Sequence, residues 1–204
     1  MVWYDIMPHY FDKQQTSEFK REEISAVIRS EKYDFNSGSG VFSIKQVDNG
    51  TKLLADKSLI HEDWDVLDLG CGYGVIGVVI ANEFPSCKIV MSDINTRAIV
   101  LTKENVSKYE LKNVKILQGD LFEKLKTKKF DTILCNPPYV AGRKLTFDII
   151  EESKHHLKKN GILQIVFRHQ KGGKVVMKKM QEVFGNCKDV AKKSGYRIYV
   201  SALV

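Results

Sequence analysis

Four consecutive residues, Asn136-Pro137-Pro138-Tyr139, have the groups needed for chemistry on a planar amine. Such an amine is a poor nucleophile because its lone pair is delocalised. The side-chain carbonyl of Asn136 and the backbone carbonyl of Pro137 can accept hydrogen bonds from the amine hydrogens. The two prolines stiffen the turn, and the ring of Tyr139 can stack on a flat group. The tetrapeptide therefore indicates catalysis of alkylation at a planar nitrogen.

A glycine-rich turn, Gly70-Cys71-Gly72-Tyr73-Gly74, lies between an apolar strand pattern and an apolar helix pattern. Glycines let a backbone approach a ligand closely and adopt positive φ. Residues 72–77 also match GxGxxG, but a lone match is weak support for a dinucleotide. Asp68, Asp120 and the 136–139 tetrapeptide argue against NAD, because hydride transfer has no use for the tetrapeptide.

The elements that would position these residues alternate regularly from residue 64 onward. The sequence predicts an α/β fold: a Rossmann-like, doubly wound, seven-stranded sheet whose last strand is antiparallel. Turn residues Ser194-Gly195 predict the final hairpin. The expected strands are 65–70, 88–93, 114–120, 130–135, 161–169, 188–193 and 195–204, and the expected helices are 75–84, 96–109, 145–159 and 175–185.

The first sixty residues predict a small α/β extension on the substrate side of the fold. We expect an amphipathic helix over residues 16–30, capped by Thr16 or Ser17. Strand character is expected over 41–47, followed by a turn at 48–50 and a helix over 51–60. The predicted organisation is a single domain, 1–204, in which 1–60 form the extension and 61–204 the cofactor-binding and catalytic core.

Length and composition limit the classes of protein to which the chain can belong. The 204 residues suffice for one buried domain. The chain has no apolar run of membrane-spanning length and no signal-peptide layout, which predicts a soluble cytoplasmic protein. Its four cysteines are separated by 16, 48 and 52 positions, and neither these nor the five histidines have metal-site spacing. We expect reduced thiols and no metal, and the sequence indicates no oligomeric state.

Charge is distributed unevenly along the chain. Residues 1–102 carry 10 Lys and Arg against 15 Asp and Glu, whereas residues 103–204 carry 22 against 10. The net charge is therefore −5 in the first half and +12 in the second. This asymmetry favours a polyanionic partner such as RNA.

The glycine-rich turn and the NPPY tetrapeptide together resemble class I S-adenosylmethionine-dependent methyltransferases that modify amide or exocyclic nitrogens. Residues 37–59, SGSGVFSIKQVDNGTKLLADKSL, are similar to a segment of the small-subunit ribosomal RNA guanine-N2 methyltransferases. The closest resemblance is to their compact archaeal, single-domain relatives, and it extends from about residue 30 to about residue 200. Bacterial members of that family carry an additional N-terminal domain, which this chain is expected to lack.

The resemblance implies S-adenosyl-L-methionine as cofactor. Asp68 would bind its ammonium group, and Asp93, 21 residues after Gly72, would bind the ribose hydroxyls. Ile94 would pack on the adenine. The adenine amine would donate to Asp120, with Leu121 as an apolar contact. The remaining cofactor-binding candidates are Gly70, Cys71, Gly72, Tyr73, Gly74 and Asn136.

The resemblance also implies a guanine held by Asn136, Pro137 and Tyr139, with Pro138 stiffening the motif and Phe42 on the substrate side. Basic and polar residues at the same end of the sheet could hold RNA; they are Arg143, Lys144, Arg168, Gln170 and Lys171.

Three alternatives remain open. The same acceptors suit adenine or a transfer RNA base. Methyltransferases that modify a glutamine amide in release factors also carry a similar tetrapeptide. The chain could also be an RNA-binding or ribosome-assembly module without activity, although the presence of Asp68, Asp93 and Asn136 argues against it.

Overall fold

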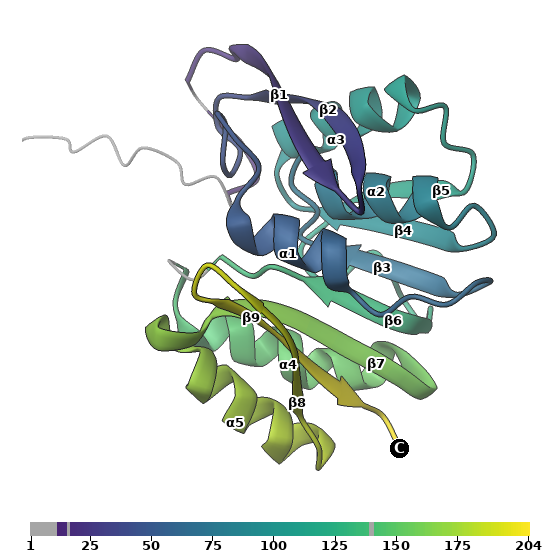
Figure 1. The fold of residues 1–204 in the computed structure, drawn as a ribbon, viewed down its shortest axis with the longest axis vertical. Helices are drawn as coiled ribbons and strands as arrows, with labels where there is room; N and C mark the ends of the chain where they lie inside the picture. The colour runs from purple at the N-terminus through teal and green to yellow at the C-terminus, as the bar shows by residue number, and fades with distance from the viewer. Residues whose placement is uncertain (1–11, 16, 139–140) are drawn as a thin grey trace, which may run out of the picture.

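The computed structural model describes residues 12–15, 17–138 and 141–204. Its centre is a seven-stranded sheet in the order β5-β4-β3-β6-β7-β9-β8 (Figure 1). Strands β3 to β7 pair in parallel, and β9 is antiparallel to both neighbours. The strands are β3 (Asp65–Leu69), β4 (Lys88–Asp93), β5 (Val114–Gln118), β6 (Phe130–Cys135), β7 (Leu157–Arg168), β8 (Lys188–Lys193) and β9 (Tyr196–Ala202). The predicted fold class is confirmed.

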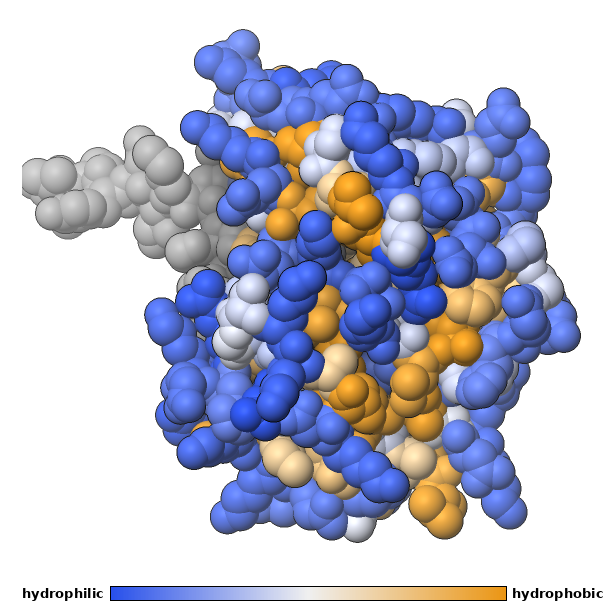
Figure 2. Space-filling view, in the orientation of Figure 1, coloured by the Kyte–Doolittle hydropathy of each residue, from blue (hydrophilic) through white to orange (hydrophobic). Residues whose placement is uncertain are grey.

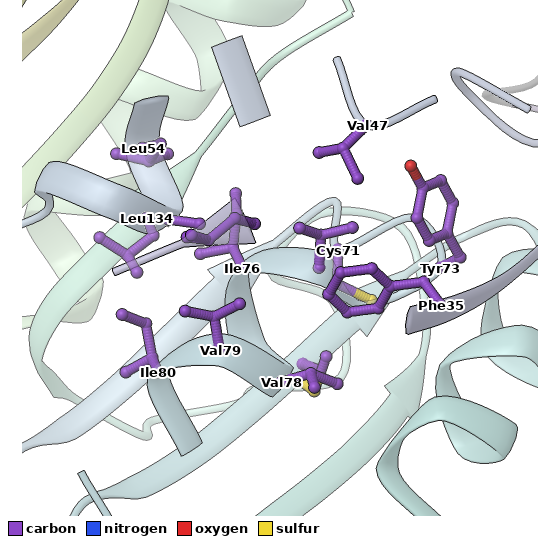
Figure 3. Packing of buried hydrophobic residues seen from close by; sticks show 14 of the residues in the cluster. Phe35, Val47, Leu54, Cys71, Tyr73, Ile76, Val78, Val79, Ile80 and Leu134 are labelled. Carbon is purple, nitrogen blue, oxygen red and sulfur yellow. The ribbon is translucent and has the colours of Figure 1, made fainter. Parts of the chain in front are cut away.

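Helices cover both faces of this sheet (Figure 1). One buried cluster joins α1 (Asn49–Lys57), α2 (Val75–Glu83) and α3 (Thr96–Lys108) to one face. A second cluster joins α4 (Arg143–His156) and α5 (Gly173–Phe184) to the other. Within the first cluster, Ile76, Val79 and Ile80 of α2 lie beside Leu54 of α1 and Leu134 of β6 (Figure 3). The near-continuous apolar sequence of α2 follows from this burial on several sides.

The predicted core elements agree with the structure to within a few residues, except at β7. That strand begins at Leu157, where the sequence pattern predicted a helix as far as residue 159. The outer surface is mostly hydrophilic on the face shown in Figure 2, with hydrophobic side chains visible in a broken band across its middle. None of the helices in the described ranges is long and apolar enough to cross a membrane.

The predicted helix over residues 16–30 is wrong. Residues 21–38 instead form an antiparallel hairpin of β1 (Arg21–Ile28) and β2 (Glu31–Gly38). Arg29 and Ser30 both have positive φ, 50° and 68°, which suits the two-residue turns that match the twist of paired strands. The sequence prediction failed because Arg-Ser lacks the usual glycine or asparagine.

The expected strand over 41–47 and the expected turn at 48–50 are also wrong. Residues 41–47 form bends and turns in which Val41 and Val47 are buried. Asp48 is the N-cap of α1, and its side chain accepts hydrogen bonds from the backbone N–H groups of Gly50 and Thr51. Asp48, which the sequence pattern predicted to lie in a turn, therefore caps the start of a helix.

Asn105 of α3 ties the N-terminal hairpin to the core. Its side chain is fully buried. Its Oδ1 accepts from the Asn36 N–H at 2.7 Å, while its Nδ2 donates to the carbonyls of Asn36 and Tyr73 at 2.9 and 2.8 Å. One amide thus joins β2 to the glycine-rich turn, and Phe35 packs edge-on against Tyr73 beside it (Figure 3).

We expect Asn105→Ala to lower the free energy of unfolding by about 3 kcal/mol, because it leaves buried backbone groups of two segments without partners. Urea denaturation followed by circular dichroism measures this change. Lys103→Ala, an exposed site on the same helix, is the control and should change it by less than about 0.5 kcal/mol. Equal losses for both variants would contradict the role given to Asn105.

Candidate active site

A cavity of about 280 Å³ lies at the carboxyl ends of β3, β4 and β6. The chain runs from β3 to β4 and β5 on one side and places β6 on the other, and ligands of open α/β sheets bind where the strand order reverses in this way. The structure brings most predicted site residues together here. Those lining the cavity are Phe42, Gly70, Cys71, Gly72, Tyr73, Asp93, Ile94, Asp120, Leu121, Asn136, Pro137 and Pro138.

The glycine-rich turn faces the cavity with bare backbone. Gly70 and Gly72 have φ of 71° and 58°, and a Cβ built on either would meet nothing within 4 Å. Both glycines line the cavity, so the backbone here leaves room for close approach by a ligand, and we call this stretch the glycine cradle. Gly77 has a different role, because a Cβ there would lie 2.6 Å from Met91 Cε. It allows α2 to pack closely on β4.

Asp68 is buried beneath this turn with an exposed fraction of 1%. Its Oδ2 accepts from the Gly77 N–H at 2.9 Å, but its buried Oδ1 has no hydrogen-bond partner among the described residues. Burial, followed by repulsion from Asp93, raises the pKa of Asp68 to about 7. A buried acceptor without a donor is costly, so this oxygen suits a donor supplied by a ligand or by water.

Asp93 ends β4 and holds the glycine-rich turn in place. Its Oδ2 accepts from the Gly72 N–H and its Oδ1 from the Asn95 N–H, both at 2.8 Å. Burial raises the pKa of Asp93 to about 6. Asp120 is exposed and also lines the cavity, beside Leu121, whose φ is 42°. Two of the acids predicted to hold a cofactor, Asp93 and Asp120, thus line one cavity, whereas Asp68 is buried behind the lining residues and is bonded to Gly77.

Asn136 uses its side-chain nitrogen for hydrogen bonds to other described residues. Its Nδ2 donates to Thr51 Oγ1 at 2.8 Å and to Asp48 Oδ2 at 3.2 Å. Within the described ranges, neither its Oδ1 nor the Pro137 carbonyl accepts a hydrogen bond, whereas the Pro138 carbonyl accepts from Ala141 at 3.0 Å. The two acceptors predicted for a planar amine are therefore both available.

Sequence reasoning missed three residues of this wall: Asp48, Thr51 and Tyr196. Tyr196 donates from its hydroxyl to Asp48 Oδ1 at 3.1 Å. An aspartate just before a predicted helix is a common N-cap and was a signal for Asp48. Nothing local marked Tyr196, because strand pairing across the sheet brings it to the cavity.

The basic residues predicted to bind substrate lie around the cavity and do not line it. Arg143 and Lys144 are exposed in the first turn of α4, where Lys144 pairs with Asp148 at 2.7 Å. Arg168 ends β7 with its guanidinium 5.1 Å from the centre of the Tyr196 ring. Gln170 and Lys171 are exposed on the 3-10 helix His169–Lys171.

The prediction for Tyr139 falls outside the described residues. Across the described residues, no group of three or more His, Cys, Asp or Glu side chains is placed to hold a metal ion.

Comparison with known proteins identifies the class of this fold and site. The family model described as "Methyltransferase small domain" matches residues 32–200. The chain belongs to this family and is an S-adenosylmethionine-dependent methyltransferase, which confirms the class and cofactor predicted from the sequence.

Relatives refine this placement. The chain is 40% identical to a protein of Bacillus subtilis described as uncharacterized protein YbxB, over 93% of this chain and 96% of that protein. It is 32% identical to ribosomal RNA small subunit methyltransferase C of Actinobacillus succinogenes, over 78% of this chain and 48% of that enzyme. The 16S rRNA N2 G1207 methyltransferase (RsmC) of T. Thermophilus, solved with AdoMet and guanosine, matches with a TM-score of 0.77 at 22% identity, over 94% and 52% of the two chains.

The resemblance to small-subunit ribosomal RNA guanine-N2 methyltransferases is thereby confirmed. The chain spans about half the length of the small subunit methyltransferase C relatives that it matches. The YbxB match covers nearly all of both chains and shows that a protein of this size also occurs in a bacterium.

We expect the ligand-free protein to lose stability as pH rises from about 4 to about 7. The pKa of Asp68 is raised from 3.8 to about 7, so between these values the folded state binds a proton that the unfolded state has released. Folding then becomes less favourable as pH increases. Thermal melts of the wild type and Asp68→Asn at pH 5, 6, 7 and 8 measure this effect. The melting temperature of the variant relative to that of wild type should increase as pH rises. A difference in melting temperature that does not change with pH would contradict the raised pKa of Asp68.

Proposed function

We propose that this chain transfers a methyl group from S-adenosylmethionine to the exocyclic amine of a base in RNA, with guanine N2 of small-subunit ribosomal RNA as the substrate. The observation that carries the proposal is the pair of available acceptors, Asn136 Oδ1 and the Pro137 carbonyl, on the wall of the same cavity as the glycine cradle. The similarity to small subunit methyltransferase C proteins supports guanine in ribosomal RNA.

The residues of the cradle fit the cofactor. The orphaned Oδ1 of Asp68 would accept from its ammonium group, and the open backbone at Gly70 and Gly72 leaves room for its amino-acid part. Asp93, although it accepts two backbone hydrogen bonds, retains lone pairs for ribose hydroxyls. When bound, S-adenosylmethionine supplies an electrophilic methyl group on a positively charged sulfur.

The chain's own contribution to catalysis is alignment. Asn136 and Pro137 accept from the two hydrogens of the amine and so direct its lone pair into the cavity, while excluding other orientations. Because the sulfonium of S-adenosylmethionine would present an already activated methyl carbon, a strong general base is unnecessary, and the proton on the amine nitrogen would pass to water. The same geometry accepts any exocyclic amine, which is why the proposal of guanine rests on the relatives.

A basic rim beside the cavity supports RNA as the substrate class. Lys171, Lys174, Lys192 and Lys193 are exposed, and none forms an ion pair with a described residue. Residues 192 and 193 end β8 next to Tyr196, which lines the cavity. Lysines without carboxylate partners are suited to phosphate contacts.

We expect the double variant Lys192→Gln/Lys193→Gln to weaken RNA binding and to reduce the slope of log affinity against log salt by about 2, since each lysine neutralises one phosphate. Fluorescence anisotropy with a labelled RNA oligonucleotide at several salt concentrations measures both quantities. Lys188→Gln, an exposed lysine at the other end of β8, is the matched control and should leave both unchanged. Equal effects of the double variant and the control would argue against this surface.

We expect Asn136→Ala to reduce methyl transfer at least about a hundredfold, because it removes one of the two acceptors that align the amine. Its affinity for S-adenosylmethionine, measured by calorimetry, should change little.

Transfer of labelled methyl to small-subunit RNA, large-subunit RNA, transfer RNA and release factor, followed by nucleoside digestion, identifies the substrate. N2-methylguanosine in small-subunit RNA supports the proposal, whereas label confined to release factor would assign the glutamine reaction.

A further inference from the structure

Asp48 accepts four hydrogen bonds from three different parts of the fold. Its Oδ2 accepts from the N–H groups of Gly50 and Thr51 at 2.8 and 3.1 Å and from Asn136 Nδ2 at 3.2 Å. Its Oδ1 accepts from the Tyr196 hydroxyl at 3.1 Å. The first two bonds cap α1, but neither the bond to Asn136 nor that to Tyr196 is needed for capping.

We propose that Asp48 is the positioning residue that fixes the orientation of the Asn136 side-chain amide, so that its carbonyl oxygen faces the substrate. This inference rests on the proposed function, because it concerns how the same site holds its amine. Asp48 would act through Asn136 and would not itself contact the reacting atoms.

The reason is that an amide can turn about its last bond, and its two ends are nearly identical in size. One orientation presents an acceptor to the cavity and the other presents an NH₂ group, which would oppose the hydrogens of an incoming amine. An ionised carboxylate only accepts hydrogen bonds, so it selects the orientation with Nδ2 toward Asp48. Thr51 cannot make this selection alone, since its hydroxyl can donate as well as accept.

Asp48 is itself held rigidly. The capping bonds fix one carboxylate oxygen and the Tyr196 hydroxyl fixes the other. A Cβ on Gly50 would lie 2.7 Å from the Tyr196 ring, so α1 and β9 are in close contact at this point. The guanidinium of Arg168 covers the same ring. The amide orientation is thus determined by packing between α1 and β9, both remote in sequence from Asn136.

The test uses two substitutions at Asp48 that both preserve the helix cap. Serine can accept from the backbone N–H groups but is too short to reach Asn136. Asparagine can place its Oδ1 where Oδ2 now lies, held there by the same two N–H groups, and still accept from Asn136. We expect Asp48→Ser to lower kcat for methyl transfer to RNA by roughly tenfold to a hundredfold, with KM for the cofactor nearly unchanged. Asp48→Asn should stay within about threefold of wild type.

A double-variant cycle separates positioning from a structural defect. If Asp48 acts through Asn136, Asp48→Ser should cause no further loss in an Asn136→Ala background. Full additivity of the two losses, or equal kcat losses for the serine and asparagine variants, would overturn the proposal.

A readout that does not depend on activity distinguishes failure of this inference from failure of the proposed function. The side-chain amide protons of Asn136 should exchange slowly in NMR spectra of wild type and Asp48→Asn, and measurably faster in Asp48→Ser, where the bond to Thr51 remains and the bond to residue 48 is lost. Unchanged signals in the serine variant would overturn the positioning role even if methyl transfer occurs. If wild type transfers no methyl group but the NMR difference is present, the proposed function is wrong and the positioning of the Asn136 amide by Asp48 is supported.

Discussion

Parallel pairing of β3 with β6 is the constraint on which the site depends. Leu69 pairs with Cys135, so the next residue of each strand, Gly70 and Asn136, emerges at the same edge although the two are 66 positions apart in the sequence. A shift of one residue in this register would turn one of the two motifs toward the opposite face. Both strands are almost entirely buried, and their apolar contacts on both faces hold that register.

Electrostatics at this edge work against the stability of the ligand-free protein. Asp68 and Asp93 lie close enough to repel each other, and burial raises the pKa of both. Backbone N–H groups offset only part of the cost of burying these carboxylates. One oxygen of Asp68 has no donor among the described residues. A ligand with a positive charge and several donors would relieve this penalty on binding. In the proposed function, this edge of the sheet is therefore preorganised for the cofactor at some cost to folding.

Much of this arrangement is readable from the sequence, but the N-terminal part is not. Alternating apolar segments predict the sheet, and the strand ends predict which acids converge. The first strand of the hairpin, β1, was predicted as part of a helix over residues 16–30, because the turn residues Arg29 and Ser30 carry no glycine signal. The helix cap at Asp48 could have been read locally, but its hydrogen bond with Tyr196 could not, because that bond arises from packing of α1 against β9. Propensity and periodicity describe elements, whereas the substrate wall is a product of packing between distant ones.

In the proposed function, an exocyclic amine of an RNA base is held between Asn136 Oδ1 and the Pro137 carbonyl. The most direct measurement is a crystal structure of this protein with S-adenosylhomocysteine and guanosine. We expect the guanine N2 atom within hydrogen-bond distance of both oxygens, with the cofactor product along the glycine-rich turn. Guanosine bound with N2 directed away from these oxygens, or a cofactor product bound elsewhere, would contradict it.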